Sequence, residues 1–212
     1  LLSRRQRQMC IRDRYSGNLM KILKTNQNKV DKKVIDEAVK VLADGGVILY
    51  PTDTVYGLGA NIFNRKAVKR VYNIKKRSYL KPISLLVSSK DAIPLVSKAS
   101  VNQLNFMDKY LPGPYTFILK KSKIVPRHLT SGSANVGIRV PESEIACNLA
   151  KLFPITTTSA NISSENTLDT PEEILEQLGC EVDLVIDVGP LKSKNPSTII
   201  DLTAEEPIFV KR

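Results

Sequence analysis

The chain has 212 residues, 42% of them hydrophobic, and a formal net charge of +11, so it can bury the core of one domain. No apolar run approaches the roughly 20 residues that span a bilayer, and a single histidine, His128, excludes a multi-histidine metal site. Three widely spaced cysteines exclude a disulfide framework and indicate a reducing compartment, so we expect a cytoplasmic protein without membrane association.

Residues 1–19 differ in composition from the rest of the chain. They contain five arginines, no lysine and one acid, whereas residues 20–212 contain 21 lysines and six arginines. We interpret residues 1–19 as a non-native or disordered leader, such as a remnant of cloning, read-through or assembly, and residues 20–212 as the folded domain. The remnant of an arginine-rich transit peptide is the alternative. The leader carries a formal +4, which leaves +7 on the remainder.

The hydrophobic pattern predicts helices that alternate with strands. Apolar residues recur at helical spacing over 31–43, which Gly45 closes, and over 64–75, and a short apolar run at 47–50 predicts a buried strand. Further helices are predicted at 90–96, 100–111, 142–152 and 171–178, and further strands at 83–87, 115–120, 136–140, 155–158, 184–188, 198–202 and 208–211. Because no long linker interrupts this order, we expect a single α/β domain with one large twisted mixed sheet flanked by helices.

Residues 51–60, with the sequence PTDTVYGLGA, follow the strand predicted at 47–50. Glycine lets a backbone approach a ligand closely, and short hydroxyl side chains bind polar groups at strand ends. The Gly57–Gly59 pair alone is equally consistent with an ordinary strand-to-helix turn. Polar segments later in the chain carry the case for a ligand site.

Lys75, Arg77 and Lys81 form a basic cluster at the end of the helix predicted at 64–75. In an extended segment, alternation would place Lys75 and Arg77 on the same side. Arginine grips phosphate through two hydrogen bonds and lysine adds a point charge, so the cluster suits a polyanion. An isolated cluster of this kind is more often a solvated helix end that the helix dipole favours.

Two further segments carry polar residues at predicted strands. Ser159 and Asn161 lie two apart in a turn after the strand at 155–158 and offer both donors and acceptors. Arg139 lies between apolar residues of a strand, where an arginine needs a partner, either an acid of the fold or the carboxylate of a ligand. The chain contains neither a Walker loop nor a GxGxxG fingerprint.

Taken together, these segments resemble the YrdC family of L-threonylcarbamoyladenylate synthases. The similar blocks, in the order of the family, are PTDTVYGLGA at 51–60, KKRSYLKPI at 75–83, PGPYTFILK at 112–120, VGIRVP at 136–141, TSAN at 158–161 and STIID at 197–201. The family's Lys-x-Arg and Ser-x-Asn tetrad falls on Lys75, Arg77, Ser159 and Asn161.

The resemblance implies a single YrdC-like catalytic domain over residues 20–212, a nucleotidyltransferase. It would make threonylcarbamoyl-AMP and pyrophosphate from L-threonine, bicarbonate and ATP, for threonylcarbamoyladenosine formation in tRNA. Mg²⁺ would arrive with the nucleotide, the product would pass to a downstream tRNA threonylcarbamoyl transferase, and weak RNA binding would fit the charge. The resemblance also implies a role for each site residue. The triphosphate would be held by Lys75, Arg77 and Lys81, and the α-phosphate and nucleotide would lie near Ser159 and Asn161. Threonine would be held by Thr52, Thr54, Arg139 and Ser197, with Arg139 at its carboxylate.

Two other functions remain open from the sequence. One is an RNA-binding module of the same fold, since a charge of +7 supports RNA contact, although only Phe153 lies near the polar segments as a free aromatic residue. The other is a sister enzyme that adenylates a different carbamate. Threonine-dependent release of pyrophosphate distinguishes all three.

Overall fold

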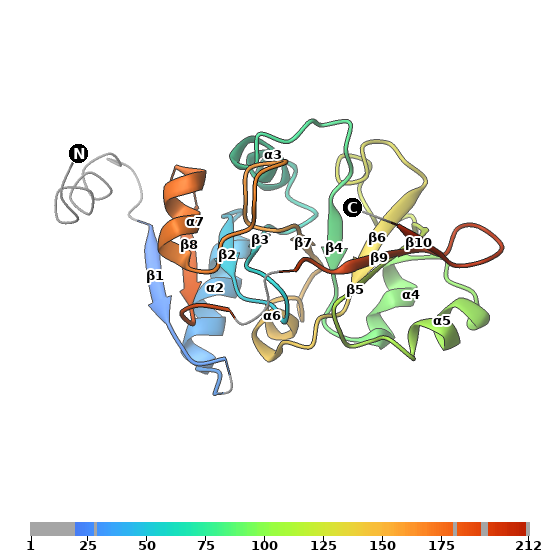
Figure 1. Ribbon diagram of the computed structural model, residues 1–212, viewed down its shortest axis with the longest axis horizontal. Helices are drawn as coiled ribbons and strands as arrows, with labels where there is room; N and C mark the ends of the chain where they lie inside the picture. Colours follow the sequence, from blue (N-terminus) through green and yellow to red (C-terminus); the bar gives the residue numbers. More distant parts are fainter. Residues whose placement is uncertain (1–19, 28, 180–181, 192–194, 211–212) are drawn as a thin grey trace.

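The structure is a computed structural model that describes residues 20–212 except 28, 180–181, 192–194 and 211–212 (Figure 1). The expectation for residues 1–19 lies outside the described residues. The helices are α2 (Lys32–Ala43), α3 (Arg65–Ile74), the 3₁₀ helix η1 (Lys90–Ala92), α4 (Ile93–Val96), α5 (Val101–Met107), α6 (Glu144–Leu149) and α7 (Pro171–Leu178). The strands are β1 (Lys21–Lys24), β2 (Ile48–Tyr50), β3 (Gly57–Gly59), β4 (Ser84–Leu86), β5 (Tyr115–Lys120), β6 (Asn135–Arg139), β7 (Ile155–Thr157), β8 (Leu184–Asp187), β9 (Thr198–Asp201) and β10 (Ile208–Val210).

The helices begin where polar side chains cap them. The Asp31 carboxylate accepts a hydrogen bond from the backbone of Lys33, and the Asn64 side chain accepts one from Ala67, so α2 and α3 start near the predicted positions. Thr170 caps α7, whose first turn contains Pro171 and two glutamates. Each cap satisfies a backbone donor that the helix itself leaves free.

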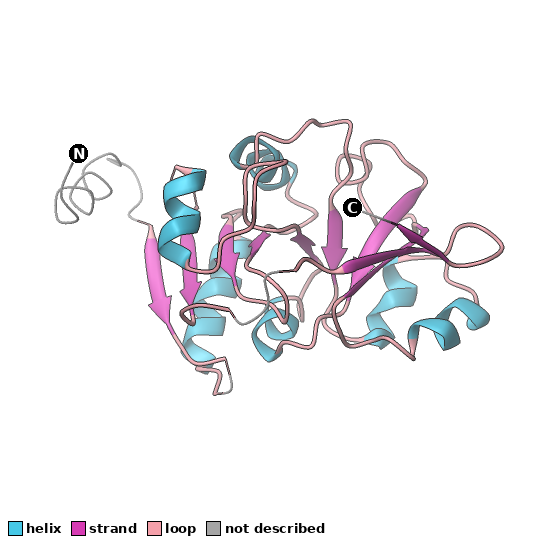
Figure 2. Cartoon of the chain, viewed as in Figure 1, coloured by secondary structure: helices cyan, strands magenta, loops and turns pink. Residues whose placement is uncertain are grey.

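The strands form one continuous mixed sheet. Its two ladders have the orders β1-β8-β2-β3 and β10-β9-β5-β6-β4-β7. Three backbone hydrogen bonds join β3 to the β7 segment: Leu58 N to Thr158 O (2.9 Å), Thr156 N to Ala60 O (2.8 Å) and Ala160 N to Tyr56 O (2.8 Å). The large mixed sheet flanked by helices, predicted from the sequence, is therefore confirmed (Figure 2).

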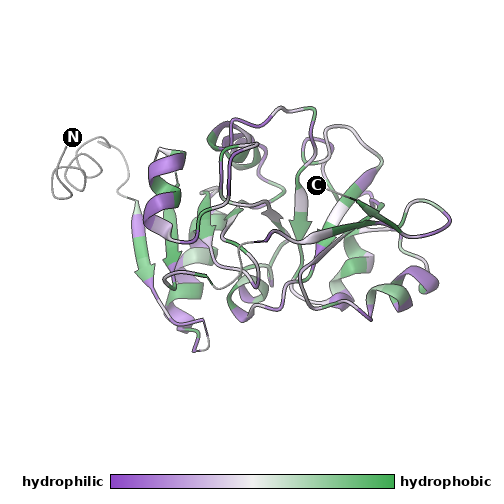
Figure 3. Cartoon of the chain, viewed as in Figure 1, coloured by the Kyte–Doolittle hydropathy of each residue, from purple (hydrophilic) through white to green (hydrophobic). Residues whose placement is uncertain are grey.

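Buried side chains lie on both faces of the central strands. On β2, Ile48 and Tyr50 pack into a cluster with α2 and α6, while Leu49 packs into the larger cluster that includes α3 and α7. The hydrophobic colour of the inner strands in Figure 3 follows this double burial. Strands covered on both faces become continuous apolar runs, which explains why the sequence predicted most of them.

Two strands were not predicted. β1 has only one half-buried side chain, Leu23, and depends on parallel pairing with β8, far along the sequence. β3 lies within the segment expected to be a loop, and its glycines pack under a tyrosine. A Cβ added at Gly57 or at Gly59 would stand 3.0 Å from the ring of Tyr50. Close packing of that ring therefore requires both glycines.

Candidate active site

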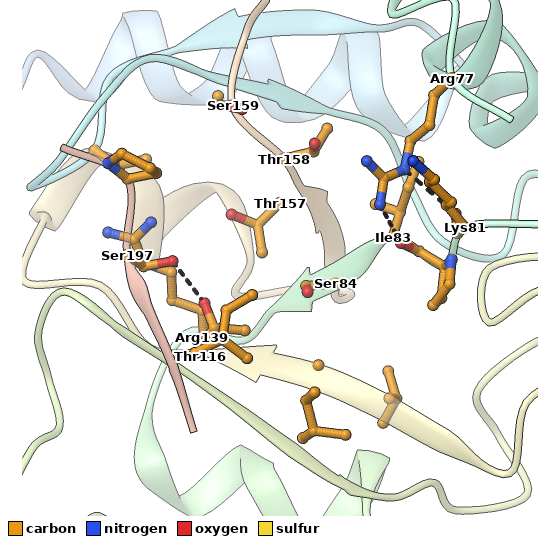
Figure 4. Close-up of a pocket in the computed structure, with 18 of the residues that line it drawn as sticks. Arg77, Lys81, Ile83, Ser84, Thr116, Arg139, Thr157, Thr158, Ser159 and Ser197 are labelled. Atoms are coloured by element: carbon orange, nitrogen blue, oxygen red, sulfur yellow. Dashed lines mark hydrogen bonds between the residues drawn. The ribbon is translucent and has the colours of Figure 1, made fainter. Parts of the chain in front are cut away.

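A pocket of about 640 Å³ opens on one face of the six-stranded ladder (Figure 4). Alternation along the strands builds its floor: Thr116 and Ile118 of β5 line it, whereas Phe117 and Leu119 between them are buried in the core. The same alternation places Asp201 of β9 in the floor. Hydroxyl and apolar side chains thus share the lining, and the volume suits a nucleotide-sized ligand.

One end of the pocket is basic. Arg77 and Lys81 lie there together, on the loop that follows α3 (Figure 4). The loop's own backbone holds the guanidinium, because Arg77 Nη2 donates to Pro82 O at 2.9 Å and Nε donates to Lys81 O at 3.3 Å. Burial lowers the pKa of Arg77. No acidic side chain of the described chain lies within ion-pair distance of either residue, so their charge is available to an anion.

Lys75 lies behind the pocket wall and is only 2% exposed. Its Nζ donates to Ser159 O (2.5 Å), Asn161 O (2.7 Å) and Asn161 Oδ1 (3.0 Å), and Ser159 Oγ donates to the same Oδ1 at 2.7 Å. Burial, with repulsion from Arg77, lowers the pKa of Lys75 to about 7, while three oxygen acceptors favour the ammonium form. Lysine, serine and asparagine of the predicted tetrad therefore form one hydrogen-bonded cluster, and Arg77 stands apart from it.

The reason given from the sequence for pairing Lys75 with Arg77 was wrong. Lys75 has helical dihedral angles at the end of α3, and Lys76 has a φ of 49°, so the segment is not extended. The left-handed turn at Lys76 sends the two flanking side chains to different places. Arg77 reaches the pocket, Lys75 reaches the turn at 159–161, and Lys76 is exposed between them.

At the other end of the pocket lies Arg139, which is only 5% exposed. Its Nη2 forms an ion pair with Asp53 and donates a hydrogen bond to Thr54 Oγ1 at 2.8 Å. Its Nε is buried and has no hydrogen-bond partner within the described residues. The sequence left two partners open for Arg139, an acid of the fold or the carboxylate of a ligand. The acid Asp53 binds Nη2, and Nε, without a partner in the described chain, is left for a ligand.

Ser197 and Thr52 complete this end of the pocket. Ser197 Oγ and Thr116 Oγ1 are 2.8 Å apart (Figure 4), and Thr52 Oγ1 is 3.0 Å from Thr54 Oγ1. Thr52, Thr116 and Ser197 are buried and line the pocket as Arg139 does, while Thr54 accepts from Arg139 behind the wall. They form a polar surface suited to a small hydroxylated or carboxylated ligand.

Six of the nine predicted site residues line the pocket, and three lie behind its wall. The lining residues are Thr52, Arg77, Lys81, Arg139, Ser159 and Ser197; the others are Thr54, Lys75 and Asn161. Sequence reasoning missed Asp53, Ser84, Thr116, Thr157 and Asp201. TFIL at 116–119 and TIID at 198–201 do not alternate polar and apolar residues, so the sequence carried no periodic signal for Thr116 or Asp201.

The described chain offers little to a metal ion. No group of three histidine, cysteine or acidic residues gathers anywhere in the described ranges. Within the described part of the chain, Asp201 is the one carboxylate that lines the pocket, and its Oδ1 already accepts hydrogen bonds from Thr203. Among the same residues, every helix is too short or too polar to cross a membrane.

Comparisons with known proteins agree with this geometry. The family model Sua5_yciO_yrdC, described as "Telomere recombination", matches residues 40–212. A Methanocaldococcus jannaschii protein, provisionally named a threonylcarbamoyl-AMP synthase, is 40% identical over 197 residues, 92% of each chain.

Two solved structures are similar over most of the chain. Pyrococcus abyssi Sua5, crystallised with L-threonine, superposes with a TM-score of 0.84 at 31% identity, over 90% of this chain and 56% of that one. Escherichia coli YciO, an uncharacterised protein, has a TM-score of 0.84 at 34% identity, over 91% and 95% of the two chains. The chain therefore spans about half of Sua5 and nearly all of YciO.

Proposed function

The chain belongs to the Sua5/YciO/YrdC family, and we propose that it is an L-threonylcarbamoyladenylate synthase. The reaction would join L-threonine, bicarbonate and ATP into threonylcarbamoyl-AMP and pyrophosphate. The relatives named threonylcarbamoyl-AMP synthase and the threonine complex of Sua5 support this activity. The three widely spaced cysteines support a cytoplasmic location for this activity.

One observation carries the proposal: a single pocket with cations at two separate ends and neutral hydroxyls between them. ATP and threonine both bring negative charge, and they must meet within one cavity. Arg77 and Lys81 suit the triphosphate, because arginine binds phosphate oxygens through two hydrogen bonds. Arg139 suits the threonine carboxylate, because its buried Nε has no acceptor among the described residues.

The chemistry then needs mainly positioning. The amino nitrogen of threonine would bond to the carbon of bicarbonate with loss of water, which gives a carbamate. A carbamate oxygen would then form a bond to the α-phosphorus of ATP. The bond from that phosphorus to the β-phosphate oxygen breaks, and pyrophosphate leaves. Ser159 lies on the wall between the two cationic ends and suits a contact near the α-phosphate. Lys75 and Asn161 hold Ser159 from behind and act as positioning residues.

Mg²⁺ fits as a companion of the nucleotide. Because the described residues of the pocket include a single carboxylate, Asp201, the ion would be held mainly by phosphate oxygens and would neutralise their charge. The remaining task of the described residues is to bind and orient, which Arg77, Lys81 and Arg139 perform in the proposal.

The test is release of pyrophosphate from ATP with and without L-threonine and bicarbonate. We expect release only when both are present, with serine a poor substitute because it lacks a methyl group worth about 1–3 kcal/mol in an apolar pocket. Release with another amine or carbamate instead of threonine would identify the sister enzyme. RNA binding without any release would identify the RNA-binding module.

A further inference from the structure

A second cavity, of about 730 Å³, lies beside α3. Arg65, Lys69 and Tyr72 of α3 line it at positions i, i+4 and i+7, which fall on one face of a helix. The loop after α3 contributes Tyr79, and the turn near residue 128 contributes Arg127. The loop that follows α3 thus borders two cavities, since Arg77 and Lys81 of the same loop line the proposed active site.

The charge in this cavity is positive and uncompensated. Arg65, Lys69 and Arg127 are exposed, and within the described ranges none of them has an acidic partner at ion-pair distance. Of the residues that the structure describes, no acidic one lines the cavity. Three cations from two separate segments around one hollow favour an anionic ligand.

An aromatic surface lies next to these cations. The rings of Tyr72 and Tyr79 are 4.9 Å apart and inclined by 32°, and Tyr79 is 49% exposed. Tyr72 is held in place because its hydroxyl donates to Lys81 O at 3.0 Å. A half-exposed ring supported by a fixed one is a surface on which a nucleobase can stack.

We propose that this cavity is a second, non-catalytic binding site for a nucleoside phosphate. Arg65, Lys69 and Arg127 bind the phosphate, and the base lies against Tyr79. The volume lies within the range of small-molecule sites. A free nucleotide and a residue of single-stranded RNA share this chemistry. The site goes beyond the proposed synthase activity and does not depend on it.

The experiment is equilibrium dialysis with radiolabelled AMP at fixed ionic strength. The variant Lys69→Gln/Arg127→Gln should bind one equivalent of AMP fewer than the wild type at a concentration that saturates the wild type. Its matched control, Lys66→Gln/Lys123→Gln, loses the same charge from exposed positions outside the cavity and should bind as the wild type does. All four residues are exposed, so melting curves should coincide.

The base contact is tested separately. Tyr79→Ala should weaken AMP binding at this site about tenfold, since stacking of a base contributes roughly 1–3 kcal/mol. Unchanged stoichiometry and affinity in Lys69→Gln/Arg127→Gln would overturn the proposal. Inorganic phosphate that displaces AMP at equal concentration would overturn its nucleoside part.

A single-stranded hexaadenylate identifies the source of the ligand. If the hexaadenylate binds more than tenfold tighter than AMP, and Lys69→Gln/Arg127→Gln abolishes this binding, the ligand is an RNA strand. If the hexaadenylate and AMP bind with comparable affinity, the ligand is a free nucleotide. Failure of the proposed function has a different signature. Threonine-dependent pyrophosphate release would then be absent, while the variant would still lose its equivalent of AMP.

Discussion

Arg139 and Asp53 form an ion pair in the pocket wall, 86 residues apart in the sequence. Both side chains are at most 10% exposed, and Asp53 Oδ2 also accepts a hydrogen bond from the backbone of Glu142 at 3.1 Å. Asp53 thereby fixes the guanidinium while Arg139 Nε keeps no partner within the described chain. A charged anchor with one satisfied and one unsatisfied nitrogen is prepared for a carboxylate.

Asp53→Asn should raise the KM for threonine about tenfold or more, because a hydrogen bond to a charged group contributes roughly 1.5–3 kcal/mol. The KM for ATP should change little, since Arg77 and Lys81 lie at the other end of the pocket. Steady-state kinetics with each substrate varied in turn measure the two effects. Glu142→Gln is the control, because that side chain is exposed. Equal increases for both substrates would mean that the whole pocket had collapsed.

Arg77→Ala should lower kcat/KM by two to three orders of magnitude, roughly the 3–4 kcal/mol of a lost transition-state contact. Lys76→Ala should have little effect, because Lys76 is exposed between two residues that face inward. The comparison uses threonine-dependent pyrophosphate release. If both variants retain activity, the basic loop is only a solvated helix end, which is the alternative that the sequence left open for this cluster.

Lys75→Met should destabilise the fold by about 1–3 kcal/mol, because that is roughly the cost of a buried acceptor left without a donor. Asn161 O loses the Lys75 donor in this variant, whereas Ser159 O keeps the backbone N–H of Asn161 and Asn161 Oδ1 keeps the Ser159 hydroxyl. Urea denaturation followed by circular dichroism measures the change. Lys81→Met, at an exposed position, is the control and should unfold as the wild type does.

The same lysine predicts a pH dependence of stability. Burial lowers the pKa of Lys75 in the folded chain to about 7 from its ordinary value of 10.5, so between these values the unfolded chain binds more protons. The unfolding free energy of the wild type, minus that of Lys75→Met, should therefore rise from pH 7 to pH 10. Tyr50 and Tyr56, whose pKa burial raises to about 12, lower stability above pH 10 in both proteins and cancel in the difference. A flat difference would mean that the three oxygens keep the ammonium form at its ordinary pKa.

The sequence predicted the elements whose residues carry their own signal. Asn64 caps α3, and the apolar run at 47–50 is β2, because capping and burial on both faces are local properties of the sequence. The sequence could not predict β3, since Gly57 and Gly59 are poor strand formers that the ring of Tyr50 requires. Tertiary packing decided the structure there.

The site divides in the same way. Similarity to a family identified which segments meet, and the structure brings Arg77, Lys81, Arg139 and Ser197 to one pocket. It could not identify Asp53 as the partner of Arg139, because no local pattern links residues 86 apart. Nor could the similarity show which residues line the pocket and which lie behind its wall. Lys75, for example, is buried because it binds the turn at Ser159, which lies 84 residues away in the sequence.

The last prediction concerns Gly137, in the pocket floor. A Cβ there would stand closer than 3.0 Å to Ser84 Oγ and 3.0 Å from Ser84 Cβ, so Gly137→Ala should cost about 1–3 kcal/mol of stability. Ser84→Gly removes both atoms, and the double variant should therefore be more stable than the sum of the two single changes implies. Thermal unfolding of all four proteins gives the coupling energy. A coupling energy within about 0.3 kcal/mol of zero would mean that the strands of the pocket floor shift to accommodate the added methyl group without contact with Ser84. Close strand packing would then not require glycine at this position.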